Sequence, residues 1–412
     1  MVALPRSPLA PATADGAAPP VPGVRAAAVA SGLRYKNRLD LCLIELPAGA
    51  TVAGLLTTSA TPGHPVTWCR RVLPGGRVRG VIVNAGNANV CNGPAGDDAV
   101  LAEVRAVAAA LACAEDEVLV ASTGIIGQRL DGAAIAALVP ALVEGLRGDG
   151  LADAARAIMT TDTFPKTAHA AASIDGVPVR LTGIAKGSGM IAPDMATMLA
   201  FVATDARLPA PVLQTLLRRA ADRSFHCTTV DSDTSTSDTL LLLASGVADH
   251  AAITDADDAR LLDFARALER ICLELALLVV RDGEGAEKLI EIRVAGAVDE
   301  AAARRMGLVI ANSPLVKTAI AGGDANWGRV VMAVGKSGEA VEPARLRIAF
   351  GGTVISAGGG VVEGYDEAVV ARHLAGREVL LEVDLGLGPG AATVWTCDLT
   401  HRYIDINADY RS

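Results

Sequence analysis

Residues Lys186 to Ala203, KGSGMIAPDMATMLAFVA, form the segment whose residue types best suit chemistry. The segment runs from a glycine-rich turn past a proline into an apolar, strand-like run headed by Thr197. Threonine is common in strands, so a structural role fits this position as well. The glycines have neither the spacing of a phosphate-binding loop nor that of a dinucleotide fingerprint. The segment therefore supplies a candidate hydroxyl nucleophile and no recognisable nucleotide site.

The run DSDTSTSDT, from Asp231 to Thr239, alternates carboxylates with hydroxyls and invites comparison with a calcium-binding loop. Counting from Asp231, the sixth position is Thr236, where such a loop needs glycine. The twelfth is Leu242, where it needs a bidentate glutamate. The calcium interpretation is excluded, and a loop rich in Asx and Ser/Thr turns is predicted instead.

The segment ASTGIIG, residues 121–127, follows a strand-like run and predicts a small, flexible turn. Such a turn can place a backbone N–H and a hydroxyl at one point, as an oxyanion hole requires. A tight turn without catalytic function fits the same residues.

Histidine is not the expected catalytic base. The six histidines form no H-x-x-x-H or H-E-x-x-H pattern, and no G-x-S-x-G elbow is present. No metal site is expected either, because the seven cysteines are scattered without a C-x-x-C pair. These absences favour a nucleophile activated by another nearby group, one option being its own freed α-amine.

Composition excludes several classes of protein. The chain has 412 residues and a formal net charge of −9, which argues against a general binder of nucleic acid or anionic membrane. Hydrophobic residues make up 51%, too many for a disordered chain, and aromatic residues only 3%. The start lacks the pattern of a signal peptide, and no apolar run is long enough to span a membrane. The scattered cysteines suit a reducing, cytoplasmic compartment.

Strand-like and helix-like segments alternate along the chain after a Pro- and Ala-rich lead-in of about two dozen residues, expected to be flexible. Periodicity predicts an α/β or α+β class with a mixed sheet and outer helices. Strands are expected at 80–84, 117–121, 177–184 and 239–244, and helices at 98–113 and 256–280. The last third is expected to be strand-rich from residue 287, with strands within 289–296, 346–352, 353–360, 379–386 and 393–399, interrupted by a helix at 366–374.

Together these segments resemble the ornithine acetyltransferase (glutamate N-acetyltransferase) family, from about residue 32 to residue 412. The resemblance rests on NAGNAN (84–89), STGIIG (122–127), TTDTFPK (160–166), KGSGMIAPDMATMLAF (186–201), DSDTSTSDT (231–239), RDGEGAEK (281–288), NSPLVKTAIAGGDANWGR (312–329) and the tail TCDL…YIDINADYRS. The combination of MAT, DTSTSDT and GGDANWGR is highly specific.

The resemblance implies self-cleavage between Ala196 and Thr197, giving an α-chain of residues 1–196 and a β-chain of residues 197–412. The Thr197 hydroxyl would then attack the acetyl carbon of N-acetylornithine, with the adjacent α-amine as general base. Glutamate would take the acetyl group in a ping-pong reaction without a cofactor. Thr123 and Gly124 match the oxyanion-hole pair of the family.

The resemblance also assigns substrate contacts. Lys186 would pair with an amino-acid carboxylate and Glu284 with a substrate ammonium, while Thr163, Asn407 and Ser412 would supply further polar contacts. Simpler interpretations are a solvated lysine beside a glycine turn, an acid in a loop after a helix, and a fraying chain end. The match over nearly the whole chain favours the functional assignments.

The family fold implied is a layered α/β sandwich of mixed sheets with outer helices, similar to the Ntn hydrolases, assembled as a dimer of αβ units. Two departures are Asp194 and Ser237, where an amide is more usual in the family. They resemble paralogues of specialised metabolism and leave open the acyl acceptor and the use of acetyl-CoA as a donor. Two further hypotheses are a self-processing aminopeptidase of related fold and a non-catalytic binding protein.

Overall fold

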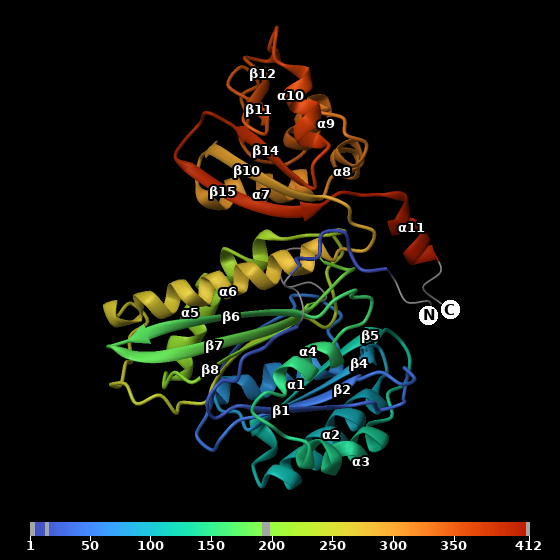
Figure 1. Cartoon of the computed structure of the whole chain (residues 1–412), viewed down its shortest axis with the longest axis vertical. Coiled ribbons are helices and arrows are strands. Elements are labelled where there is room, and N and C mark those ends of the chain that lie inside the picture. The colour runs from blue at the N-terminus through green and yellow to red at the C-terminus, as the bar shows by residue number, and fades with distance from the viewer. Residues whose placement is uncertain (1–4, 13–15, 192–197, 409–412) are drawn as a thin grey trace. The chain divides into compact units, whose positions relative to one another are not determined.

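The computed structural model describes residues 5–12, 16–191 and 198–408, which form two compact units (Figure 1). The N-terminal unit comprises the described parts of residues 12–226 and 233–279. The C-terminal unit comprises those of residues 1–11, 227–232 and 280–412. Ala196, Thr197, Asp194 and Ser412 lie outside the described residues.

Two mixed sheets form the frame of the N-terminal unit. One has the order β1 (Arg25–Val29), β2 (Leu41–Glu45), β4 (Gly80–Asn87), β5 (Val118–Ile125). The other has the order β3 (Thr51–Leu56), β9 (Thr239–Ala244), β8 (Leu199–Thr204), β7 (Val177–Lys186), β6 (Lys166–Ile174). The pairs β4–β5 and β8–β9 are parallel, and the other neighbours are antiparallel.

The helices of the N-terminal unit are α1 (His64–Val72), α2 (Pro94–Leu111), α3 (Gly132–Glu144), α4 (Leu151–Ala157), α5 (Ala210–Asp222) and α6 (Leu262–Arg281). Single 3₁₀ turns cover Leu73–Gly75, Glu115–Glu117, Phe225–Cys227 and Ala259–Leu261.

The two sheets of the N-terminal unit share one core, which explains the apolar strands. Alternate residues of β9, Leu241 and Leu243, join the same cluster as Val81 and Val83 of β4. The next residues of β9 point to the opposite face, where they are also buried. A Cβ atom on Gly183 of β7 would lie 2.7 Å from Leu275 of α6, so that helix packs closely on the sheet. Strands buried on both faces read as continuous apolar runs, as in LLLLA of β9.

The C-terminal unit is built on one six-stranded mixed sheet. The order is β13 (Gly360–Val361), β12 (Thr353–Ala357), β11 (Arg347–Phe350), β14 (Glu378–Asp384), β10 (Leu289–Ala297), β15 (Gly390–Cys397), with only β10 and β14 parallel. Its helices are α7 (Glu300–Ala311), α8 (Pro314–Ala321), α9 (Trp327–Gly335), α10 (Glu367–Leu374) and α11 (His401–Ala408). Helix α7 packs on β10 and β15.

Many predicted elements are confirmed. Strand β9 has the predicted bounds, and β4, β5, β7, α2 and α10 lie within a few residues of theirs. The layered α/β class with mixed sheets is confirmed as well. Helix α6 begins six residues later than predicted, because the acidic stretch before it forms turns, with Asp258 capping a 3₁₀ turn.

Two predictions are wrong, and one is incomplete. The lead-in is not a free segment, because Leu9, Val21 and Val24 are buried. The last third has the five predicted strands, as β10, β11, β12, β14 and β15, but it also contains the helices α7, α8 and α9, which were not predicted. Residues 122–125 continue strand β5 instead of forming a turn, because they pair with β4. Among the described residues, no helix is long and apolar enough to cross a membrane.

Candidate active site

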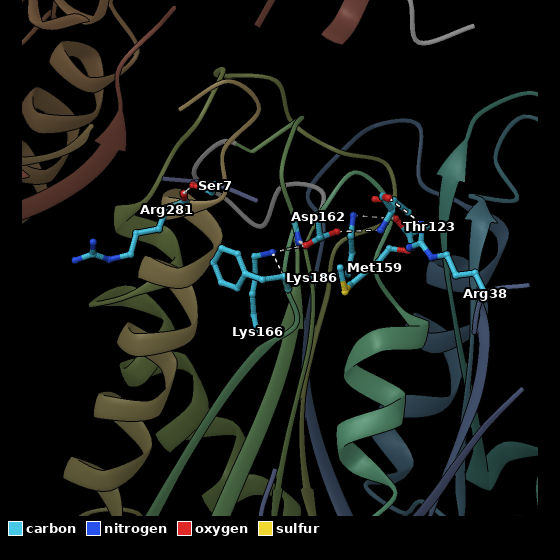
Figure 2. A network of polar contacts seen from close by, with 11 residues as sticks. Ser7, Arg38, Thr123, Met159, Asp162, Lys166, Lys186 and Arg281 are labelled. Atoms are coloured by element: carbon cyan, nitrogen blue, oxygen red, sulfur yellow. Dashed lines mark hydrogen bonds and ion pairs between the residues drawn. The ribbon is translucent and has the colours of Figure 1, made fainter. Parts of the chain in front are cut away.

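A buried polar cluster lies where strands of both sheets end in the N-terminal unit (Figure 2). Thr123 comes from β5, Lys186 is the last residue of β7, and Lys166 is the first residue of β6. The Nζ atom of Lys186 donates a 3.4 Å hydrogen bond to Oγ1 of Thr123. Both side chains are buried, with exposed fractions of 1% each. The structure thus brings together two of the residues predicted for the site.

Backbone packing holds Thr123 and Gly124 in place. Thr123 pairs with Ala85 and Gly124 with Gly86 in the parallel β4–β5 ladder. Gly124 has φ +134°, and a Cβ atom there would lie 2.2 Å from the carbonyl carbon of Gly86. Only glycine fits this close approach. Rigid strand backbone is the setting in which N–H and hydroxyl donors can be preorganised for an oxyanion.

The NAGNAN motif braces the same strand end. The Ser122 hydroxyl donates to Oδ1 of Asn84 over 2.5 Å, and Nδ2 of Asn84 donates to the carbonyl of Asn87 over 2.9 Å. Oδ1 of Asn87 accepts a 2.8 Å bond from the amide of Asn89. The asparagines therefore satisfy polar groups around the strand end that carries Thr123.

Asp162 is the buried anion of the cluster. Its Oδ1 accepts hydrogen bonds from Nζ of Lys166 (2.6 Å) and the amide of Gly187 (2.9 Å). Its Oδ2 accepts one from the amide of Thr160 (2.9 Å). Burial alone would raise the pKa of this carboxyl, but the charges of Lys166 and Lys186 and the hydrogen bonds hold it well below its usual range. Asp162 is therefore ionised at neutral pH.

Lys166 is fully buried, and its carboxylate partner lies four residues earlier in the chain. Its Nζ also donates to the carbonyl of Phe164 over 3.3 Å and lies 4.8 Å from the centroid of that ring. Asp162 and Lys166 are two site residues that were not predicted, although both belong to TTDTFPK. The period-two alternation of a strand could have indicated that Lys166 is buried, because it places Lys166 on the same face of β6 as Ala168 and Ala170.

Asp238 lies at the start of β9 beside the first described residue after the predicted cut. The amide of Met198 donates a 2.7 Å hydrogen bond to its Oδ1. Its Oδ2 is buried and accepts no hydrogen bond from any described residue. Burial raises the pKa of Asp238 well above its usual value, against the opposing effects of the Met198 amide, the Lys186 charge and nearby hydroxyls.

A second group of predicted residues lies in the C-terminal unit. Nδ2 of Asn407, on α11, donates a 2.8 Å hydrogen bond to Oε2 of Glu284 and a 3.0 Å bond to the carbonyl of Tyr403. Gly285 has φ +76°, and a Cβ atom there would lie 2.6 Å from the Tyr403 amide. The close approach of this loop to α11 therefore depends on glycine.

Comparison with known proteins matches these motifs to one family. The model of the ArgJ family covers residues 25–412 of this chain. The chain belongs to the ArgJ family. It is 57% identical to arginine biosynthesis bifunctional protein ArgJ of Gluconobacter oxydans, over 99% of this chain and 96% of the relative. It is 52% identical to the protein of the same name from Rhizobium meliloti, over 98% of this chain and 99% of the relative.

A solved structure of an ArgJ protein is also similar. The crystal structure of arginine biosynthesis bifunctional protein ArgJ from Bacillus halodurans is 40% identical and covers 51% of this chain and 98% of that chain, with a TM-score of 0.49. Family membership, established by the sequence comparisons, confirms the predicted family and the enzyme class, an acyltransferase of the glutamate N-acetyltransferase type. It also sets aside the hypothesis of a non-catalytic binding protein.

Thr163 is the remaining predicted site residue that the structure describes. Thr163 is half-buried and directly follows Asp162. Ser237, one of the departures from the usual pattern, is buried, and its amide donates a 3.0 Å hydrogen bond to Oγ of Ser235. This bond is a Ser/Thr turn of the kind predicted for the DSDTSTSDT loop.

The described residues contain no group of three or more His, Cys, Asp or Glu side chains that could hold a metal ion. All seven cysteines are free thiols, and five of them are buried. Burial raises the pKa of the Cys42, Cys69 and Cys272 thiols to about 12, so these groups are poor nucleophiles at neutral pH.

Proposed function

We propose that the chain transfers the acetyl group of N2-acetyl-L-ornithine to L-glutamate through an acetyl-Thr197 intermediate. Self-cleavage between Ala196 and Thr197 would first free the Thr197 amine, giving chains of residues 1–196 and 197–412. Ornithine would leave before glutamate reacts, so the kinetics would be ping-pong. The observation that carries this proposal is the buried contact between Lys186 and Thr123, next to the constrained Gly124.

The chemistry suits the residues present. A free α-amine has a pKa near neutrality and can take the proton of its own hydroxyl as the oxygen attacks the acetyl carbon. The tetrahedral intermediate then carries a negative oxygen. The Thr123 hydroxyl and the Gly124 amide would stabilise it, as removal of one such donor commonly costs about 100-fold or more in kcat.

Substrate recognition would use charged and polar side chains. The Lys186 ammonium would attract the carboxylate of the amino acid, and Glu284, held by Asn407, would attract a substrate ammonium. Thr163, Thr197 and Ser412 complete the proposed set of polar contacts. The substrates are small molecules, and we propose a cytoplasmic enzyme assembled as a dimer of αβ units.

The names of the relatives support the arginine pathway over specialised metabolism, since the relatives cited above are called arginine biosynthesis proteins. Their description as bifunctional supports a second activity, for which we propose acetyl-CoA as an additional acetyl donor. Asp194 and Ser237, where an amide is more usual in the family, bear on the choice of acyl acceptor. A self-processing aminopeptidase would instead release free acetate or amino acids by hydrolysis.

The test is the intact mass of the purified protein under denaturing conditions, with N-terminal sequencing of each piece. Two pieces, the second beginning TMLAF, are expected. Initial rates at several concentrations of both substrates should then give parallel double-reciprocal lines. A single uncut chain with full transfer activity would overturn the mechanism, and acetate release without transfer would favour hydrolysis.

A further inference from the structure

The ion pair of Asp162 and Lys166 is fully buried, and the mechanism proposed above does not use it. Their charged atoms lie 2.6 Å apart, and both side chains have an exposed fraction of 0%. Removing two charges from water costs free energy that their mutual attraction often fails to offset. A hydrophobic pair would fill the same space without this cost. The pair therefore calls for an explanation beyond stability.

Hydrogen bonds connect this pair to the backbone that carries Lys186. Oδ1 of Asp162 accepts from Lys166 and also from the amide of Gly187, the residue directly after Lys186. Lys166 itself stands opposite Ala185 in the β6–β7 ladder, on the other side of Lys186 in the chain. Asp162 thus fixes the point at which β7 ends and the Lys186 side chain leaves it.

Lys186 in turn determines how the Thr123 hydroxyl can be used. A hydroxyl that accepts a hydrogen bond from an ammonium has to direct its own hydrogen elsewhere. Within the described ranges, no residue accepts that hydrogen from Thr123. The hydroxyl is therefore left as a donor, and a charged donor behind it strengthens the bond that it gives.

We propose that Asp162 and Lys166 are positioning residues for acetyl transfer, which hold Lys186 and Gly187 so that Lys186 keeps the Thr123 hydroxyl pointed at the oxyanion. This inference rests on the proposed function and adds two residues to it. Neither residue touches the substrate. Their effect passes through Lys186.

The charge of the cluster supports this arrangement. The charges of Lys166 and Lys186 both act on Asp162, and the charge of Lys186 also acts on Asp238. The charges of Arg38 and Asp162 act on Tyr35. Asp162 is held in its ionised form, whereas burial favours the neutral form of Asp238. The ammonium of Lys186 places a positive charge beside the Thr123 hydroxyl. Such a charge stabilises an oxyanion that forms only in the transition state.

The test compares Asp162→Asn, Lys166→Met and the double variant. Asp162→Asn leaves two buried ammonium groups without their carboxylate, so Lys186 should lose its proton at lower pH. We expect kcat to fall about 100-fold, with a smaller change in KM. The alkaline limb of the pH–rate profile should move to lower pH. In Lys166→Met the Asp162 carboxylate no longer binds Lys166 and can pair with the Lys186 ammonium instead. For this variant kcat should fall, but the alkaline limb of the pH–rate profile should not move to lower pH.

The double variant distinguishes positioning from simple stability, and it guards against single variants that do not fold. It removes the unbalanced charge, so it should fold and recover kcat about 10-fold over Asp162→Asn while staying about 10-fold below the wild type, because the two effects are coupled. Its alkaline limb should stay displaced, since Asp162 is still missing. A double variant with the kcat and the pH profile of the wild type would overturn the inference.

Matched controls come from the exposed ion pair of Arg219 and Asp257, with charged atoms 2.8 Å apart and side chains 48% and 71% exposed. Arg219→Met and Asp257→Asn should change neither kcat nor the pH profile. Intact mass, which shows whether each protein is cut, distinguishes failure of the proposed function from failure of this inference. A wild type that neither cleaves nor transfers would refute the proposed function itself. A double variant that folds but stays uncut would refute only the assignment of the pair to the transfer step.

Discussion

The amide of Met198 donates a 2.7 Å hydrogen bond to Oδ1 of Asp238, and the amide of Thr239 donates a 3.0 Å bond back to the Met198 carbonyl. These two bonds join the first described residue of the predicted β-chain to the start of the neighbouring parallel strand. Asp238 is fully buried, so the bond is shielded from water. The carboxyl thereby determines where β8 begins.

Asp238→Ala should impair both folding and self-cleavage. The variant leaves the Met198 amide buried without an acceptor, which costs about 1–3 kcal/mol in the free energy of unfolding. Asp238→Asn retains an acceptor oxygen and should be closer to the wild type. Urea unfolding measures the first effect, and the rate at which two chains appear by intact mass measures the second. Equal behaviour of the two variants would contradict this role.

Thr197→Ala should abolish both cleavage and acetyl transfer, because the hydroxyl serves both steps in the proposed mechanism. Denaturing mass spectrometry should show one chain, and the transfer assay should show no activity above background. Thr204→Ala is the matched control, because Thr204 lies at the far end of β8 and should not take part in either step. That variant should still be cut. An uncut but active Thr197→Ala protein would exclude the mechanism.

Gly124→Ala should remove most of the transfer activity. Its Cβ atom would overlap the Gly86 backbone, so the β4–β5 pair has to separate near Thr123. A displacement of this kind can cost about 100-fold in kcat. Gly127→Ala is the matched control, because Gly127 also has a positive φ (+78°) but no atom within 4 Å of an added Cβ. It should cost about 1 kcal/mol in stability and leave kcat nearly unchanged.

Glu103 should make the stability of the protein depend on pH. It lies in α2, fully buried, and neither carboxyl oxygen has a hydrogen-bond partner among the described residues. Burial raises its pKa from 4.5 to about 8. The folded state therefore binds the proton more tightly than the unfolded state, and the free energy of unfolding falls as the pH rises from about 4.5 to about 8.

Glu103→Gln tests this dependence. The wild type should lose up to ~5 kcal/mol relative to this variant over that range, with no further loss above it. Urea unfolding at several pH values gives the comparison. Asp98→Asn, an exposed position in the same helix, is the control and should follow the wild-type curve. Parallel curves for the wild type and Glu103→Gln would contradict the prediction.

Asn407→Ala should raise KM more than it lowers kcat. The Asn407 amide donates to Oε2 of Glu284, the residue proposed to attract the substrate ammonium, so the variant removes one of the bonds that orient this carboxylate. We expect KM to rise about 10-fold, as for a lost hydrogen bond to a charged group. Asp405→Asn, on an exposed position of the same helix, should leave both constants unchanged. A fall confined to kcat would place Asn407 in the chemical step instead.

Several features of the site were predictable because they depend on local residue types. Thr123 and Gly124 were predicted from the resemblance of STGIIG to the family motif, and Lys186 from the resemblance of the segment that begins KGSG. The contact between Lys186 and Thr123 was not predictable, since the two residues lie in different sheets. The continuation of β5 through Gly124 was not predicted either, because it depends on pairing with β4, in which Gly86 stands opposite Gly124.

The sequence by itself determined the family, the α/β class, four strands of the N-terminal unit and most strands of the C-terminal unit, because apolar runs and specific motifs are local properties of the chain. Tertiary structure decided which charges meet in the interior. Asp162 and Lys166 look like ordinary polar residues in a loop and at a strand end until the fold buries them together. Burial makes the interactions of such charged groups strong, and it makes leaving them unpaired costly. Which groups are buried depends on the complete packing of sheets and helices.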